Sequence, residues 1–211
     1  MKLIILVILL IILLTIKLYE KYNQYNYKKY KITSDYINKN AKNGDLIYFR
    51  HNKTNMFVNI ATYFTHIGII FRDSETNDVK ILEIYPRRKK INKNIKIYDF
   101  NERQNSYNGE FYISFINKEI SLEKIKKVLE HEIMNAKFDY HFVINYIKQY
   151  ILQYKSNYNN PITCTNFVSN ILQICEVIDN SEQNKYPLAI NFTKLKTIND
   201  YKYSDIKYIS S

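Results

Sequence analysis

The hydrophobic pattern divides the chain into a long apolar run at the amino terminus and a mixed region of shorter apolar segments behind it. Residues 3–18 are almost entirely aliphatic, and Lys2 and Lys17 flank the core of this run. A membrane-spanning helix needs about 20 apolar residues, within a range of about 17–25. The run is slightly short, but a lysine near a helix end can extend its ammonium group to the interface. We therefore expect residues 1–20 to form a transmembrane anchor.

A cleaved signal peptide is the alternative interpretation of this run. Cleavage requires small residues behind the apolar segment, and the first Ala, Gly or Ser that follows is Ser34. This favours an uncleaved, single-pass anchor. Lysines are denser behind the run than before it, so the positive-inside rule places the following domain in the cytoplasm. We expect residues 21–40 to be a polar juxtamembrane segment and residues 41–211 to be one folded domain.

Short apolar runs in this domain predict strands of an antiparallel sheet. Residues 46–49 follow a turn signal, and residues 66–71 and 79–85 flank a polar loop rich in turn formers. A hairpin centred between residues 74 and 75 would place His66 and Glu83 nearly opposite each other on one face. Cross-strand neighbours have Cβ atoms about 4.5–5.5 Å apart.

Helical periodicity predicts three helices around this sheet. Ser121 precedes an apolar face that includes Leu122 and Ile125, and a second helix is expected over residues 142–154. A third begins near Cys164, where apolar residues recur at helical spacing through Leu172. Strands packed on helices in one domain indicate an α+β fold.

Cys164 is the first candidate for chemistry. Pro161 lies just before the predicted helix, and Thr163 is in the position of an N-cap. The first turn of a helix has unpaired N–H groups and the positive end of the helix dipole, which favour a thiolate. The alternative is a small buried apolar cysteine, the more common role of an isolated cysteine.

His66 and Glu83 are the candidates for its partners. A Glu carboxylate that accepts a hydrogen bond from one imidazole nitrogen leaves the other nitrogen free to act as a base. His66 has an alternative role as a half-buried structural histidine, and Glu83 as a solvent-facing strand residue. Ile81 and Tyr85 share the face of Glu83, and a carboxylate between apolar residues needs a partner. Gly68, two residues from His66, marks a close approach by a neighbour.

Together these segments resemble a known family. The residues 44–49, Thr65-His66-Ile67-Gly68, Leu82-Glu83 and 164–168 are similar to the circularly permuted branch of the NlpC-type papain-like superfamily. This branch includes bacterial YiiX-like proteins, a poxvirus family and relatives of lecithin retinol acyltransferase. The His strand precedes the Cys helix, as in the permuted members, and Phe138-Asp139-Tyr140 resembles their aromatic–Asp segment.

The resemblance implies a papain-like α+β domain with defined site residues. Cys164 would be the nucleophile, with its backbone N–H in the oxyanion site, His66 the base, and Glu83 the residue that orients His66. Tyr140 and Thr163 would contact substrate. Many members have Ser after the Cys where this chain has Thr165, another small hydroxyl. The resemblance does not identify the substrate.

Composition limits the partners. The net charge is +11, which favours anionic surfaces such as phospholipid headgroups, although the A/T-rich codons of its common residues are another source of this charge. No nucleic-acid motif is present, so no nucleic-acid partner is expected, and binding of nucleic acid through the basic surface stays a third alternative. No Cys/His spacing indicates a metal, and no cofactor is expected. Cys164 and Cys175 are about 16 Å apart on one helix, too far for a disulfide, which indicates a reducing compartment.

The function that we expect is acyl transfer or hydrolysis at an amide or ester carbonyl by a membrane-anchored cysteine enzyme. A peptide or other amide would make it a peptidase or amidase, and a phospholipid or thioester would make it a lipid hydrolase or acyltransferase. The superfamily favours amides first. A membrane-tethered binding protein of the same fold that carries out no turnover is the alternative.

Overall fold

The computed structural model describes most of the chain behind the amino-terminal run. The described residues are 11, 14–15, 18–19, 21–23, 25–52, 63–84, 95–131, 137–138, 161–179, 189, 192 and 195–210.

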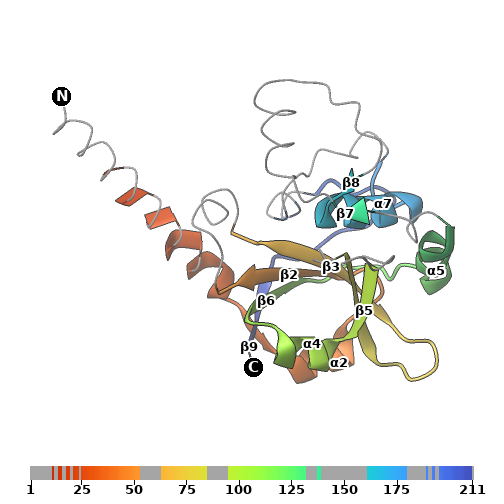
Figure 1. Cartoon of the computed structure of the whole chain (residues 1–211), viewed down its shortest axis with the longest axis horizontal. Helices are drawn as coiled ribbons and strands as arrows, with labels where there is room; N and C mark the ends of the chain where they lie inside the picture. The colour runs from red at the N-terminus through yellow and green to blue at the C-terminus, as the bar shows by residue number, and fades with distance from the viewer. Residues whose placement is uncertain are drawn as a thin grey trace.

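A seven-stranded sheet organises the domain (Figure 1). All of its neighbouring strands are antiparallel except the edge pair β1 and β9, which is parallel. A separate parallel pair is formed by β7 (Lys137–Phe138) and β8 (Pro161–Ile162). In spatial order the large sheet consists of β1 (Lys31–Thr33), β9 (Lys207–Ser210), β6 (Gly109–Ser114), β2 (Leu46–His51), β3 (His66–Arg72), β4 (Val79–Ile84) and β5 (Ile95–Asp99).

Helices cover both faces of this sheet (Figure 1). On one face, α7 (Cys164–Ile174) packs against β3 and β4, and α5 (Leu122–His131) lies beside α7. On the other face lie α2 (Ser34–Asn40) and α4 (Phe100–Ser106). This mixed arrangement of a sheet packed against helices confirms the expected α+β class.

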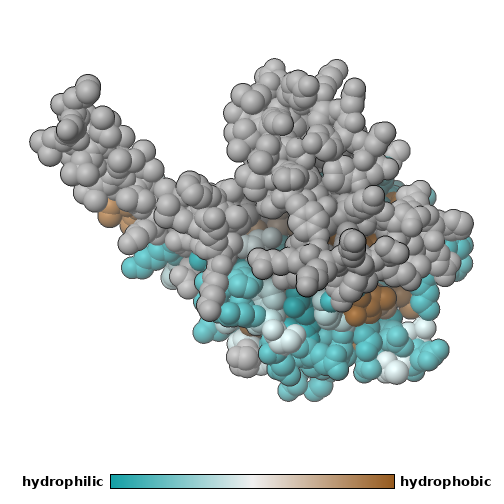
Figure 2. Space-filling model, viewed as in Figure 1, coloured by the Kyte–Doolittle hydropathy of each residue, from teal (hydrophilic) through white to brown (hydrophobic). Residues whose placement is uncertain are grey.

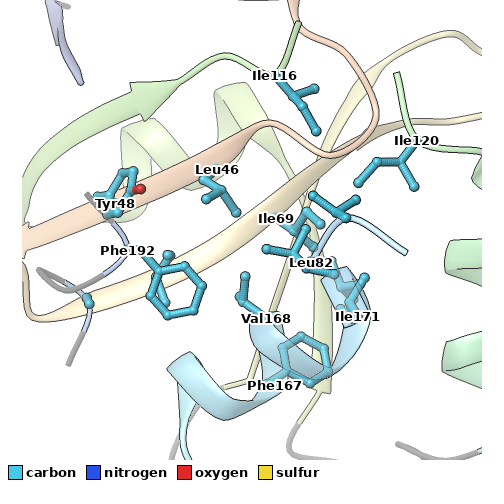
Figure 3. Packing of buried hydrophobic residues seen from close by; sticks show 14 of the residues in the cluster. Leu46, Tyr48, Ile69, Leu82, Ile116, Ile120, Phe167, Val168, Ile171 and Phe192 are labelled. Atoms are coloured by element: carbon cyan, nitrogen blue, oxygen red, sulfur yellow. The ribbon is translucent and has the colours of Figure 1, made fainter. Parts of the chain in front are cut away.

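The two helical layers explain why the central strands are apolar at nearly every position. Successive residues of a strand point to opposite faces, so Ile69 packs with α7 whereas Ile70 packs with Phe100 of α4. Figure 3 shows the larger core, where Val168 of α7 points toward Ile69 and Leu82 of the sheet. A strand covered on both faces reads as a continuous apolar run rather than an alternating one.

The predicted hairpin is present, but its register differs by two residues. Ile69 lies opposite Leu82 and Arg72 opposite Val79. Continued along the strands, this register places Gly68 opposite Glu83, so His66 and Glu83 are diagonal neighbours, two residues further apart in register than the predicted alignment. The cause is Arg72, which belongs to the ladder rather than the loop and moves the centre of the hairpin. Because the displacement is an even number of residues, His66 and Glu83 still share one face.

The folded part begins before residue 41, where the sequence placed the domain boundary. The strand β1 pairs with β9 near the end of the chain, and Ile37 of α2 is fully buried. Thr33 caps α2 by accepting a hydrogen bond from the N–H of Tyr36. The segment predicted as a juxtamembrane linker therefore contributes an edge strand and a covering helix.

Most of the predicted anchor, residues 1–20, lies outside the described residues, as does the helix predicted over residues 142–154. Within the part of the chain that the structure describes, no helix combines the length and apolar composition that a bilayer crossing requires. The described side chains Ile11, Leu14 and Leu18 are exposed. By contrast, the described surface of the domain is largely hydrophilic in the view of Figure 2.

The helical residues 25–28 attach this amino-terminal segment to the sheet. The ring of Tyr27 packs against that of Tyr63, with centroids 5.0 Å apart. Lys28 forms an ion pair with Glu110 of β6. The chain that leaves the apolar run is therefore held directly against the domain.

Candidate active site

Cys164 is the first residue of α7, as the sequence predicts. Thr163 is the N-cap, and its hydroxyl accepts a hydrogen bond from the N–H of Asn166 at 3.2 Å. The N–H of Phe167 donates to the carbonyl of Thr163. The buried side chains of Phe167 and Val168 fix the helix against the sheet, so the half-buried Cys164 is placed by both the cap and the core.

His66 is the first residue of β3 and is only 8% exposed. Its Nε2 lies 2.7 Å from Oε2 of Glu83. The ring packs against Phe49, which lies directly opposite on β2, with centroids 5.0 Å apart. The hydrogen bond and the aromatic contact together restrict the imidazole to one orientation.

Cys164 lies close enough to His66 to raise the pKa of the imidazole through its negative charge and its side chain. Since Nε2 of His66 is engaged with Glu83, Nδ1 is the ring nitrogen that remains for the thiol. By strand alternation His66 belongs to the α4 face of the sheet, whereas α7 packs on the other. His66 is the first residue of β3 and Cys164 the first residue of α7, so the two residues meet at the ends of these elements. The imidazole thereby interacts with Glu83 on one side and with Cys164 on the other.

Glu83 is completely buried in β4 and has a second cationic partner. Arg103 of α4 donates from Nε to Oε1 of Glu83 at 2.7 Å and from Nη2 to Oε2 at 3.3 Å. The carboxylate therefore lies between a guanidinium and an imidazole. The structure brings together the three predicted residues and adds Arg103, which the sequence analysis missed.

The charges of these groups are mutually dependent. Burial alone would lower the pKa of His66, but the negative charge and hydrogen bond of Cys164, together with those of Glu83, raise it to about 10. Burial alone would raise the pKa of Glu83, but His66 and then Arg103 hold it below its ordinary value. Glu83 is therefore ionised at neutral pH, and it stabilises an imidazolium at His66 when Cys164 is a thiolate.

Gly68 explains how the strands pack so closely beside this pair. A Cβ atom there would lie 3.0 Å from the carbonyl oxygen of Leu82, and 3.2 and 3.3 Å from Cγ2 of Ile81 and Ile47. These distances leave no room for a side chain without displacement of a neighbour. The prediction that Gly68 marks a close approach is confirmed, and the neighbours are the two flanking strands.

The Gly44–Asp45 turn of the resemblance has a structural role. Gly44 has a φ of +103°, a conformation that favours glycine. The buried carboxylate of Asp45 accepts hydrogen bonds from the N–H groups of Lys42 at 2.8 Å and Ile116 at 2.7 Å. Burial raises the pKa of Asp45 to about 7, although both backbone donors oppose this shift. Asp45 thus joins the start of β2 to the segment after β6.

The remaining predicted residues fall into two groups. Tyr140 lies outside the described residues, and the substrate contact of Thr163 stays a prediction beside its observed role as a cap. Both cysteines are free, as expected. Among the described residues, no group of three or more His, Cys, Asp or Glu side chains could hold a metal ion.

Comparison with known proteins leaves this site to be interpreted from its own chemistry. No protein-family model matches the chain, and no curated protein matches it either.

Proposed function

We propose that this protein is a membrane-anchored cysteine hydrolase or acyltransferase with a permuted papain-like domain of the NlpC type. One observation carries the proposal: a nearly buried imidazole is hydrogen-bonded to a buried carboxylate and interacts electrostatically with a cysteine at a helix start. Nucleophile, base and orienting group in this order are the parts that nucleophilic catalysis requires. They also come from the positions that the resemblance assigns.

The chemistry follows from the geometry. His66 takes the proton of the Cys164 thiol, and the thiolate attacks the carbonyl carbon of an amide or ester. The resulting oxyanion lies at the start of α7, where the backbone N–H of Cys164 and the helix dipole offset its charge. The imidazolium then gives its proton to the departing amine or alcohol as the C–N or C–O bond breaks. This leaves an acyl thioester on Cys164.

The thioester can be released in two ways. When water attacks, His66 accepts a proton from the water and returns it to the cysteine sulfur as the C–S bond breaks, and the product is a carboxylic acid. When an alcohol, thiol or amine attacks, the acyl group is transferred instead. The superfamily favours a peptide or other amide as substrate. The anchor and the positive net charge of the chain favour a lipid as the second candidate.

Location supports a substrate near a bilayer. The described end of the amino-terminal segment packs directly on the sheet through Tyr27 and Lys28. From Leu18 to Tyr27 a helix rises about 14 Å, and the headgroup layer of one leaflet occupies about 5–8 Å of this. With residues 1–20 in the membrane, the domain would lie close to the headgroups, on the cytoplasmic side by the charge bias.

The test is the pH-dependent alkylation of each cysteine by iodoacetamide, measured by mass spectrometry of the separate peptides. We expect Cys164 to react at pH 6–7 and His66→Ala to slow this reaction at least tenfold, because the imidazole is what maintains the thiolate. Cys175, the C-cap of α7, is an internal comparison: it is 1% exposed, and burial raises its pKa to about 11.

Two outcomes would contradict the enzyme proposal. If Cys164 reacts no faster in the wild type than in His66→Ala, the imidazole does not activate the thiol. If Cys164→Ser still forms a covalent adduct with a cysteine-directed activity probe, the nucleophile is a different residue. In the first case a membrane-tethered binding protein without turnover would account better for this site.

A further inference from the structure

Arg103 is a buried cation directly behind the candidate site. It is 8% exposed, and its guanidinium lies 4.7 Å from the ring centroid of Tyr98 and 4.9 Å from that of Tyr107. Two of its nitrogens donate to Glu83. Aromatic rings lie against the guanidinium while its edge pairs with a carboxylate, an environment that suits a planar cation.

Local structure determines the position of this side chain. Asp99 caps α4 by accepting hydrogen bonds from the N–H groups of Asn101 and Glu102. Phe100 and Arg103, three residues apart, are the buried residues of this short helix. Phe100 packs in the core cluster on this face of the sheet, so the helix cannot rotate without exposing it. The guanidinium is thereby held against β4.

We propose that Arg103 is a positioning residue of the site: it neutralises Glu83 and so leaves the positive charge of the His66 imidazolium available to the Cys164 thiolate. The proposal rests on the proposed function, because it concerns the same thiol and imidazole. It assigns to Arg103 an effect on reactivity that passes through Glu83, with no contact to the reacting atoms.

The effect of Arg103 on the thiol is electrostatic. Glu83 is fully buried, so little water screens it from its neighbours. If His66 were its only counter-ion, imidazolium and carboxylate would form a neutral pair, with little attraction left for a thiolate. With Arg103 present, the guanidinium balances the carboxylate, and the three groups together carry one positive charge beside Cys164.

Arg103 also fixes which oxygen serves the imidazole. Its Nε takes Oε1 of Glu83, so Oε2 is the oxygen that faces Nε2 of His66 at 2.7 Å. A paired fork of N–H donors holds the plane of a carboxylate in a way that a single donor does not. Arg103 therefore sets the orientation of the His66 imidazole indirectly, through the carboxylate of Glu83.

A purely structural role is the alternative, in which Arg103 only attaches α4 to the sheet. Removal of one partner from a buried ion pair destabilises a protein whether or not the pair affects chemistry. Loss of stability or of total activity therefore cannot separate the two roles. The pH at which Cys164 becomes reactive can separate them, because it depends on charge at the site.

The experiment compares alkylation of Cys164 by iodoacetamide from pH 5 to 9 in folded wild type, Arg103→Met and Arg103→Lys. In Arg103→Met we expect the onset of reaction to move up by about one pH unit, which slows labelling at pH 6 about tenfold. In Arg103→Lys the charge is kept, and we expect the onset to stay near the wild-type value. An unchanged onset in folded Arg103→Met would overturn the proposal.

Arg72→Met is the matched control. Arg72 donates to the carbonyl oxygens of Ala41, Asn77 and Asn38 and has no contact with Glu83 among its described hydrogen bonds. Its loss should lower the stability of the protein without moving the onset of alkylation. If Arg72→Met moves the onset as far as Arg103→Met does, the shift reflects general destabilisation and the proposal fails.

A double variant covers the case in which Arg103→Met does not fold. Arg103→Met combined with Glu83→Leu removes both buried charges together and leaves no side-chain group at position 83 that could bond His66. If Arg103 acts through Glu83, this double variant should show the same pH profile as Glu83→Leu alone; a further shift would contradict the proposal. His66-dependent labelling in the wild type tests the proposed function separately, so the two failures are distinguishable.

Discussion

Replacement of Glu83 by glutamine removes one charge from a fully buried position and leaves the shape of the side chain almost unchanged. In the wild type both carboxylate oxygens are used: Oε2 faces His66 at 2.7 Å and Oε1 accepts from Arg103 at 2.7 Å. Glutamine has one oxygen and one NH2 group in their place. If the oxygen stays with Arg103, the NH2 group must face His66.

Two consequences follow for the variant. Removal of one partner of a buried ion pair costs about 3–5 kcal/mol. Glutamine keeps one hydrogen bond to Arg103, so we expect a loss of unfolding free energy near the lower limit, about 3 kcal/mol. The NH2 group can only donate, so Nε2 of His66 must accept and the ring becomes neutral. Without an imidazolium, Cys164 should react with iodoacetamide at least tenfold more slowly at pH 6–7.

Unfolding in guanidinium chloride measures the loss of stability. Alkylation measured on the separate peptides gives the change in reactivity of Cys164. Glu123→Gln is the control, because Glu123 is exposed and pairs with Lys127 on the surface, where such a pair contributes about 0–1 kcal/mol. A loss of under about 1 kcal/mol in Glu83→Gln, with alkylation of Cys164 unchanged, would refute the view that a charged Glu83 organises this site.

Three further predictions use other features of the structure. Gly68→Ala should lower the unfolding free energy by about 1–3 kcal/mol, because its Cβ would enter a space already filled by both flanking strands; equal denaturation midpoints would contradict this. The pKa of His66 is raised from 6.5 to about 10, so the stability from its protonation is complete below pH 6.5 and lost as pH rises toward 10. Unfolding curves across this range should show that loss in wild type and not in His66→Gln. Full-length protein should stay with membranes through a carbonate wash, and protein lacking residues 1–20 should be released.

The central strands could be predicted from the sequence because they are covered on both faces. Their apolar runs have turn formers at their ends, and the predicted segments 46–49, 66–71 and 79–85 contain most of β2, β3 and β4. The outer strands β1 and β9 gave no such signal. They are short and partly exposed, and they pair across almost the whole length of the chain.

The hairpin register shows where local information ends. The sequence places Arg72 in the polar loop, next to a run of turn formers. It remains in β3 because its guanidinium donates to the backbone of Ala41 and Asn38, which belong to another part of the chain. These acceptors are distant in the sequence, so local sequence patterns cannot predict the contacts.

The candidate site divides in the same way. Cys164 has a local signal, the start of an amphipathic helix behind a capping threonine. His66 and Glu83 have a weaker one, the shared face of two neighbouring strands. Arg103 has none, because α4 is short and polar in sequence, and its burial depends on the position of Phe100 against the sheet.

A stricter use of the same chemistry would nevertheless have pointed to Arg103. A carboxylate between apolar residues needs partners, and His66 is one of them. An ionised carboxylate has two oxygens and about four acceptor positions, and one imidazole N–H serves only one of them. Full burial of Glu83 therefore requires a second donor, and a charged one best offsets the loss of water. The chain has few arginines, and Arg103 belongs to the helix that directly follows β5, the strand paired with β4. The number of hydrogen bonds that a buried group must form is thus a constraint that reaches beyond local sequence, and here it leads from Glu83 to Arg103.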